Sequence, residues 1–129
     1  MPESAIICVD DEVVILDSLK EQLKRSFGNN FIYEVAESAE EAWEVIEELE
    51  SDEIDIIVIV SDWLMPGTKG DEFLIQIHQR FPQLITIMLT GQADEPAIAR
   101  AKKEANLHAC LYKPWTEEEL AKIIMTALK

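Results

Sequence analysis

Five polar residues of the kinds that bind metal ions and phosphoryl groups each stand directly after a short apolar run. They are Asp10 and Asp11 after residues 5–9, Asp62 after 56–61, Thr90 after 84–89, and Lys113 after 107–112. If the runs are strands of one parallel sheet, their carboxyl ends converge on a single edge, where ligands bind. Three carboxylates, a hydroxyl and an ammonium in one cleft indicate chemistry with a divalent cation and a phosphoryl group.

The three carboxylates indicate Mg²⁺. Acids packed at one sheet edge repel one another, and this raises their pKa values unless a cation is present. Mg²⁺ prefers oxygen ligands and usually takes one or two carboxylates together with a phosphate. The predicted site contains no Cys or His, which argues against zinc. A carboxylate held beside the metal, such as Asp62, can attack a phosphoryl donor and become an aspartyl phosphate.

Each of these residues also has a purely structural explanation. Asp10 and Asp11 would be favourable at a helix N-terminus. Asp62 would suit the start of a turn, Thr90 the start of a helix, and Lys113 a solvated position before a proline. A shared site explains better why the acid pair, the single acid, the hydroxyl and the lysine occupy four different strand ends.

Strand-like and helix-like segments alternate five times along the chain. The expected strands are residues 5–9, 31–36, 56–61, 84–89 and 107–112. The first expected helix carries a stripe of Leu16, Leu19, Leu23 and Phe27 and ends at residues 28–30. The second is capped by Ser38 and Glu41, the third ends before Pro82, and the fourth spans residues 95–105. The last is capped by Thr116 and Glu119, and its inward residues are Leu120, Ile123, Ile124, Ala127 and Leu128. This alternation predicts a parallel sheet with right-handed crossovers.

The composition of the strands predicts their order. The first, third and fourth are almost wholly apolar, as central strands buried on both faces are. The second alternates in polarity, and the fifth is short and carries His108, so both suit the edges. We therefore expect one α/β domain over residues 1–129, a doubly wound (βα)5 fold with strand order 2-1-3-4-5. Asp10, Asp11 and Asp62 would then lie at the point where the order reverses.

The charge balance excludes some partners. With 26 acidic and 11 basic residues the net charge is −15, so direct nucleic-acid binding is not expected. Ten acids between residues 37 and 55, with no Lys or Arg among them, are read as a solvated helix face rather than a docking site for a basic partner.

The cysteines and the apolar runs indicate a compartment. Cys8 and Cys110 are expected as buried free thiols in a reducing environment. No signal-peptide pattern is visible, and no apolar run approaches the ~20 residues that a membrane span needs. A cytoplasmic location without a membrane partner follows as an expectation.

Four segments resemble the motifs of receiver domains of bacterial two-component response regulators, which have a CheY-like, flavodoxin-like fold. They are Val9-Asp10-Asp11-Glu12, Ser61-Asp62-Trp63-Leu64-Met65-Pro66-Gly67, Leu89-Thr90-Gly91 and Tyr112-Lys113-Pro114. The resemblance spans essentially the whole chain. It implies that Asp62 accepts the phosphoryl group, and that Asp11 binds Mg²⁺ directly and Asp10 directly or through water. It also implies that the backbone carbonyl of Leu64 is a metal ligand, that Lys113 contacts the phosphoryl group, and that Thr90 is a switch hydroxyl.

The resemblance also implies a function. A sensor histidine kinase or a histidine phosphotransfer protein would phosphorylate Asp62, and the domain would catalyse only its own phosphorylation and dephosphorylation. The surface of the fourth helix, fifth strand and fifth helix would then change for an output domain or protein. A phosphorylation-dependent homodimer is left open as a further partner.

Four residues near the site set its individual properties. Cys110 stands where family members often carry an aromatic residue, so coupling between Thr90 and an aromatic ring is not expected. Tyr112, also assigned to the signalling surface, is expected to point differently from Cys110. Leu64 and Gln92 would flank the attacking water, and since only Gln92 can bond to water, a moderately long-lived acyl phosphate is expected.

Two other functions fit the residues less well. A Mg²⁺-dependent phosphohydrolase with an aspartyl nucleophile would usually carry a second acid where Leu64 stands, and it would need a cap for which the chain has no room. A receiver-like module that is never phosphorylated would not need all five polar residues. Trp115, just after Lys113 and Pro114, would support that loop or face a partner, and packing is favoured.

Overall fold

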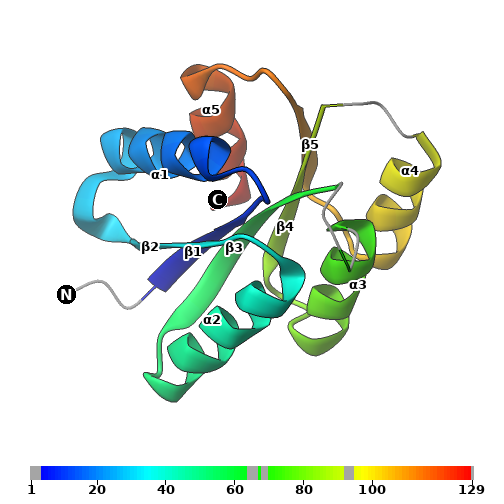
Figure 1. Ribbon diagram of the computed structural model, residues 1–129, viewed down its shortest axis with the longest axis horizontal. Helices are drawn as coiled ribbons and strands as arrows, with labels where there is room; N and C mark the ends of the chain where they lie inside the picture. The colour runs from blue at the N-terminus through cyan, green and yellow to red at the C-terminus, as the bar shows by residue number, and fades with distance from the viewer. Residues whose placement is uncertain (1–3, 64–66, 68–69, 92–94, 129) are drawn as a thin grey trace.

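The computed structural model describes residues 4–63, 67, 70–91 and 95–128, which form a five-stranded parallel sheet between two layers of helices (Figure 1). The strands are β1 (Ser4–Val9), β2 (Ile32–Ala36), β3 (Asp55–Asp62), β4 (Ile85–Thr90) and β5 (Ala109–Tyr112). The helices are α1 (Val13–Phe27), α2 (Ala39–Ser51), α3 (Gly70–Arg80), α4 (Glu95–Glu104) and α5 (Glu117–Ala127), with a 3₁₀ turn at Gly28–Asn30. The strand order is β2-β1-β3-β4-β5, so the predicted flavodoxin-like fold is confirmed.

The sheet separates two apolar cores. Alternate residues of a strand point to opposite faces, so Ile7 of β1 packs with α2, α3 and α4, whereas Ile6 packs with α1 and α5. β1, β3 and β4 are buried on both faces, whereas β2 and β5 are the more exposed edges that their composition predicted. This burial fixes the strand register, and with it the level at which each strand ends.

The helix ends follow most of their sequence signals. Thr116 and Glu119 form a complete capping box, whereas at α2 the structure shows the half in which Ser38 Oγ accepts from the Glu41 amide. Gly28 ends α1 at φ +59°, a backbone conformation that glycine adopts at no steric cost. The expectation that Leu128 lies in the core is wrong, since it follows the last turn of α5 and is 38% exposed.

In the described ranges, no helix has the length and apolar content that crossing a membrane requires.

Candidate functional site

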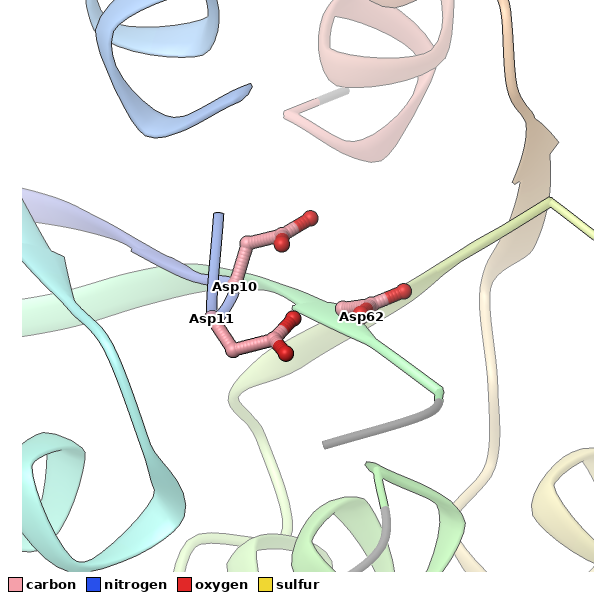
Figure 2. A group of neighbouring side chains, drawn as sticks. All are labelled: Asp10, Asp11 and Asp62. Atoms are coloured by element: carbon pink, nitrogen blue, oxygen red, sulfur yellow. The ribbon is translucent and has the colours of Figure 1, made fainter. Parts of the chain in front are cut away.

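Three acidic side chains meet at the carboxyl edge of the sheet, where β1 and β3 end. One carboxylate oxygen from each of Asp10, Asp11 and Asp62 lies within 4.8 Å of the other two. Figure 2 shows Asp10 and Asp11 just beyond the end of β1, with Asp62 beside them at the end of β3. The register explains this meeting, because Val9 of β1 is level with Ser61 of β3. The sequence predicted this cluster, and the structure brings it together.

Asp10 is fully buried and firmly held. Its backbone amide donates to the Ala36 carbonyl at 3.1 Å, and its Oδ1 accepts from the Glu12 amide at 2.9 Å. Burial raises the pKa of Asp10, while the Glu12 amide and the nearby Lys113 oppose that rise.

Asp62 is 4% exposed and occupies the last position of β3. The next residue is tied to the neighbouring strand, since the Trp63 amide donates to the Leu89 carbonyl at 2.9 Å. Burial and the charge of Asp10 raise the pKa of Asp62 to about 6, although Lys113 pulls it down. The carboxylate is therefore ionised near neutral pH, in a setting that disfavours its charge.

Lys113 directly follows β5 and forms ion pairs with both buried acids. Its Nζ lies 3.0 Å from Asp10 Oδ2 and 3.3 Å from Asp62 Oδ1. Burial lowers the pKa of Lys113, but the two carboxylates outweigh it and the net pKa shift is upward. Its backbone amide donates to the Thr90 carbonyl at 2.8 Å, so Lys113 and Thr90, which is 2% exposed, are adjacent at the ends of β5 and β4.

The donor set fits a hard divalent cation. Three carboxylates face one ammonium, which leaves an excess of negative charge at the site. Asp10 Oδ2 is buried with no aligned hydrogen-bond donor in the described part of the chain, although the Lys113 ammonium lies nearby. A second cation would relieve the repulsion and satisfy this oxygen, and carboxylate oxygens are the ligands that Mg²⁺ prefers.

Other predicted residues fall elsewhere. Leu64 and Gln92 lie outside the described residues. Cys110 is half-buried rather than buried, and Tyr112 is 49% exposed. The expectation that Tyr112 points differently from Cys110 is wrong, because both residues lie in β5, two positions apart. Residues two apart on a strand share a face.

Two residues of α1 that no motif indicated contact the segment after Lys113. Gln22 accepts a hydrogen bond from Trp115, and Arg25 donates to Glu117. The sequence offers no signal for these pairs except polar residues near an apolar stripe, because a pattern does not show which distant segment a helix will face.

Comparison with known proteins identifies the family. The sequence model of the response regulator receiver domain family matches residues 6–125. The chain belongs to the response regulator receiver domain family. Such domains are phosphorylation-dependent signalling switches of two-component systems and not metabolic enzymes.

The relatives of this receiver domain agree with that assignment. It is 28% identical to the hydrogenase transcriptional regulatory protein HoxA of Cupriavidus necator over 98% of this chain, and it spans 24% of the length of that relative.

Solved receiver domains share its fold. The signal receiver domain of an HD domain-containing protein from Pseudomonas fluorescens Pf-5 superposes with a TM-score of 0.87 at 28% identity, over 98% of this chain and 94% of that one. The beryllofluoride-activated NtrC4 receiver domain dimer gives a TM-score of 0.81 at 28% identity, over 95% and 94% of the two chains.

Proposed function

We propose that residues 1–129 act as one receiver domain that accepts a phosphoryl group on Asp62 with the help of Mg²⁺. The donor would be a sensor histidine kinase or a histidine phosphotransfer protein. The observation that carries this proposal is the position of the Asp62 carboxylate, which is nearly buried, lies beside Asp10 and Asp11, and is 3.3 Å from the Lys113 ammonium.

Each side chain has a part that its position supports. Asp62 is the nucleophile, and Lys113 helps to keep it ionised by opposing the rise in its pKa. Asp10 and Asp11 would hold Mg²⁺ together with Asp62, and the bound ion would neutralise charge on the carboxylates and on the transferring group. Lys113 would neutralise the phosphoryl oxygens, and Thr90 would donate a hydrogen bond to them. The family resemblance adds the backbone carbonyl of Leu64, which lies outside the described residues, as a further proposed metal ligand.

The output would follow from the position of the new charge. Thr90 and Lys113 stand at the ends of neighbouring strands, and Thr90 is paired in register with Tyr112. Movement of Thr90 toward a phosphoryl group would therefore alter the surface that α4, β5 and α5 share. A partner that binds the altered surface better shifts the population toward it. The dimer of the activated NtrC4 receiver makes a second copy of this chain one candidate partner, beside an output domain or protein.

The cytoplasmic location is part of the proposal. Both cysteines are free thiols, and this fits a reducing compartment.

Intact-mass measurement after incubation with acetyl phosphate and Mg²⁺ tests the proposal. The wild-type protein should gain one phosphoryl adduct, and Asp62→Asn should gain none. Asp55→Asn is the matched control, because Asp55 is an exposed acid at the opposite end of the same strand and its loss should leave the adduct intact.

Two outcomes would replace the proposal. No adduct on the wild type would make the chain an unphosphorylated interaction module. Repeated release of phosphate from a sugar phosphate would make it a phosphohydrolase.

A further inference from the structure

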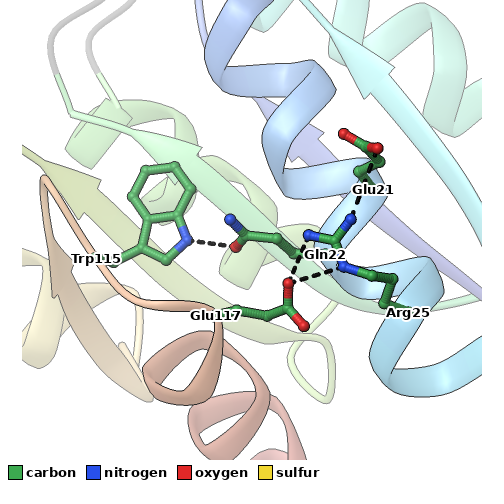
Figure 3. Close-up of polar contacts among 5 residues, drawn as sticks. All are labelled: Glu21, Gln22, Arg25, Trp115 and Glu117. Carbon is green, nitrogen blue, oxygen red and sulfur yellow. Dashed lines mark hydrogen bonds and ion pairs between the residues drawn. The ribbon is translucent and has the colours of Figure 1, made fainter.

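The loop between β5 and α5, which carries Lys113, is anchored at both ends by hydrogen bonds. At its start the Lys113 amide donates to the Thr90 carbonyl at 2.8 Å. At its end Thr116 and Glu119 close the capping box of α5. Between these anchors lies Trp115, whose indole Nε1 donates to Gln22 Oε1 of α1 at 2.7 Å (Figure 3).

The Trp115–Gln22 contact is partly shielded from solvent. Both side chains are half-buried, and the indole packs against the apolar core under α1 and α5. An indole has one donor and no acceptor. Loss of the Gln22 oxygen would therefore leave a partly buried N–H without this partner, which is costly.

The neighbouring ion pair is less protected. Arg25 Nη2 lies 2.6 Å from Glu117 Oε1, with side chains 56% and 40% exposed. Glu21 lies 3.6 Å from the same guanidinium (Figure 3). Exposed pairs of this kind contribute little, because water screens them. The indole contact is therefore the stronger candidate for fixing the loop.

The position of Lys113 depends on that loop. β5 has four residues, lies at the edge of the sheet and pairs with β4 alone. No strand on its outer side holds Lys113, yet the ammonium must reach both Asp10 and Asp62. A lysine stem is flexible, so its reach depends on where the backbone is held.

Helix α1 is connected both to the acids of the site and to the loop that carries Lys113. It begins two residues after Asp11, and through Gln22 it also contacts the loop that follows Lys113. A displacement of the loop relative to α1 would therefore change the separation between the ammonium and the acids.

We propose that Gln22 and Trp115 are positioning residues for phosphoryl uptake at Asp62, acting by holding Lys113 between the two buried carboxylates. The expected effect on the rate of uptake rests on the proposed function, whereas the expected restraint of the Lys113 side chain does not.

Two variants remove the hydrogen bond with little other change. Gln22→Leu deletes the acceptor on a residue of good helix propensity, and Trp115→Phe deletes the donor but keeps an aromatic ring. Gln22→Glu retains an acceptor oxygen and serves as the conservative rescue. Arg25→Gln is the matched control, because it breaks the neighbouring α1–α5 contact and leaves the indole bond in place.

The rate of uptake from acetyl phosphate at saturating Mg²⁺ is measured against donor concentration. Gln22→Leu and Trp115→Phe should each lower the maximal rate roughly threefold to tenfold, the range expected for one lost hydrogen bond. The half-saturating donor concentration should stay unchanged. The double variant should be no slower than either single one, because both remove the same bond. Gln22→Glu and Arg25→Gln should stay within about twofold of wild type.

NMR of the Lys113 side chain without Mg²⁺ or phosphodonor separates this inference from the proposed function. The ε-methylene protons should be restrained in the wild type and averaged in both hydrogen-bond variants. Slower uptake with unchanged Lys113 signals, or an equal slowing in Arg25→Gln, would overturn the inference and leave the proposed function standing. Altered Lys113 signals in a protein whose wild type takes up no phosphoryl group would instead refute the proposed function.

Discussion

The ammonium of Lys113 lies 3.3 Å from the Asp62 carboxylate, although 51 residues separate the two in sequence. The same ammonium lies 3.0 Å from Asp10, so one cation serves two buried acids. Three carboxylates with one ammonium have more negative charge than the ion pairs neutralise. The site is therefore strained electrostatically until a second cation or the loss of a charge relieves it.

Removal of the ammonium tests this relationship. Lys113→Met keeps an unbranched side chain of similar length but leaves Asp10 and Asp62 without their cation. We expect unfolding free energy in EDTA at pH 7.5 to fall by about 3 kcal/mol, as is typical when one partner of a buried pair is lost. Mg²⁺ should bind more tightly to the variant, since no cation competes with it, and should restore part of the stability. Phosphoryl uptake should nevertheless be slower. Weaker Mg²⁺ binding would contradict this view of the charge balance.

The raised pKa of Asp62 predicts how stability depends on pH without metal. The pKa of Asp62 in the folded protein is about 6, against 3.8 for an ordinary Asp side chain. Between about pH 4 and 6 the folded state binds more protons at Asp62 than the unfolded state does, so this contribution to stability falls as the pH rises. Above pH 6 the destabilisation is fully present, at most about 3 kcal/mol. Asp62→Asn should therefore raise the unfolding midpoint in EDTA at pH 8 and change it little near pH 4.

Urea unfolding at both pH values measures this effect. Asp55→Asn removes an exposed acid, so the difference in its stability between pH 4 and pH 8 should be the same as in the wild type. Saturating Mg²⁺ should shrink the advantage of Asp62→Asn at pH 8. If Asp62→Asn were less stable than wild type at pH 8 in EDTA, the desolvation argument would be wrong.

Mg²⁺ binding should be visible in the fluorescence of Trp63. This half-buried indole directly follows Asp62, so a cation bound at the acids changes its electrostatic surroundings. Trp63→Phe should abolish most of the change on Mg²⁺ titration. Asp11→Asn should weaken the apparent affinity for Mg²⁺ by roughly tenfold or more. Loss of a group that only orients a metal ligand already costs that much, and Asp11 is a proposed ligand itself. Glu12→Gln, an exposed neighbouring acid, should bind Mg²⁺ as the wild type does.

The fold and the acid cluster could be predicted because each depends on a repeating or local pattern. Apolar runs of strand length identify the central strands, and their order places Asp10 and Asp62 at one edge. The apolar runs end one residue before β3 and β4 do, so that Asp62 and Thr90 are the last residues of their strands rather than the first after them. Element boundaries depend on hydrogen bonds to a neighbouring strand, which a single segment does not reveal.

Contacts of a helix with a segment far away in sequence could not be predicted in the same way. The Gln22–Trp115 hydrogen bond joins residues 93 apart, and nothing in either segment specifies the other. Leu128 shows a related difficulty, because it follows the last turn of α5. There the helical period no longer determines burial, and the side chain is 38% exposed.

The two cysteines should differ in reactivity. Cys8 is 1% exposed. Its pKa is raised to about 12, mainly by burial and further by the charge of Asp10. Cys110 is half-buried at the edge strand. Titration with a thiol reagent at pH 8 should label one cysteine in the native protein and two in denaturant, because the thiolate is the reactive form. Cys110→Ala should abolish labelling of the native protein. Native labelling that persists in this variant would mean that Cys8 is accessible.

Replacement of Cys110 should leave phosphoryl uptake unchanged. Its side chain is half-buried on the edge strand β5, whereas the ion pairs of the site run between Lys113 and the acids at the ends of β1 and β3. Cys110→Ala and Cys110→Ser should both take up the phosphoryl group within about twofold of the wild-type rate, as expected for a side chain outside the reacting groups. Thr90→Val is the contrasting variant, because loss of its hydroxyl should alter the response of the α4–β5–α5 surface. Loss of uptake in either Cys110 variant would show that this position takes part in the reaction itself.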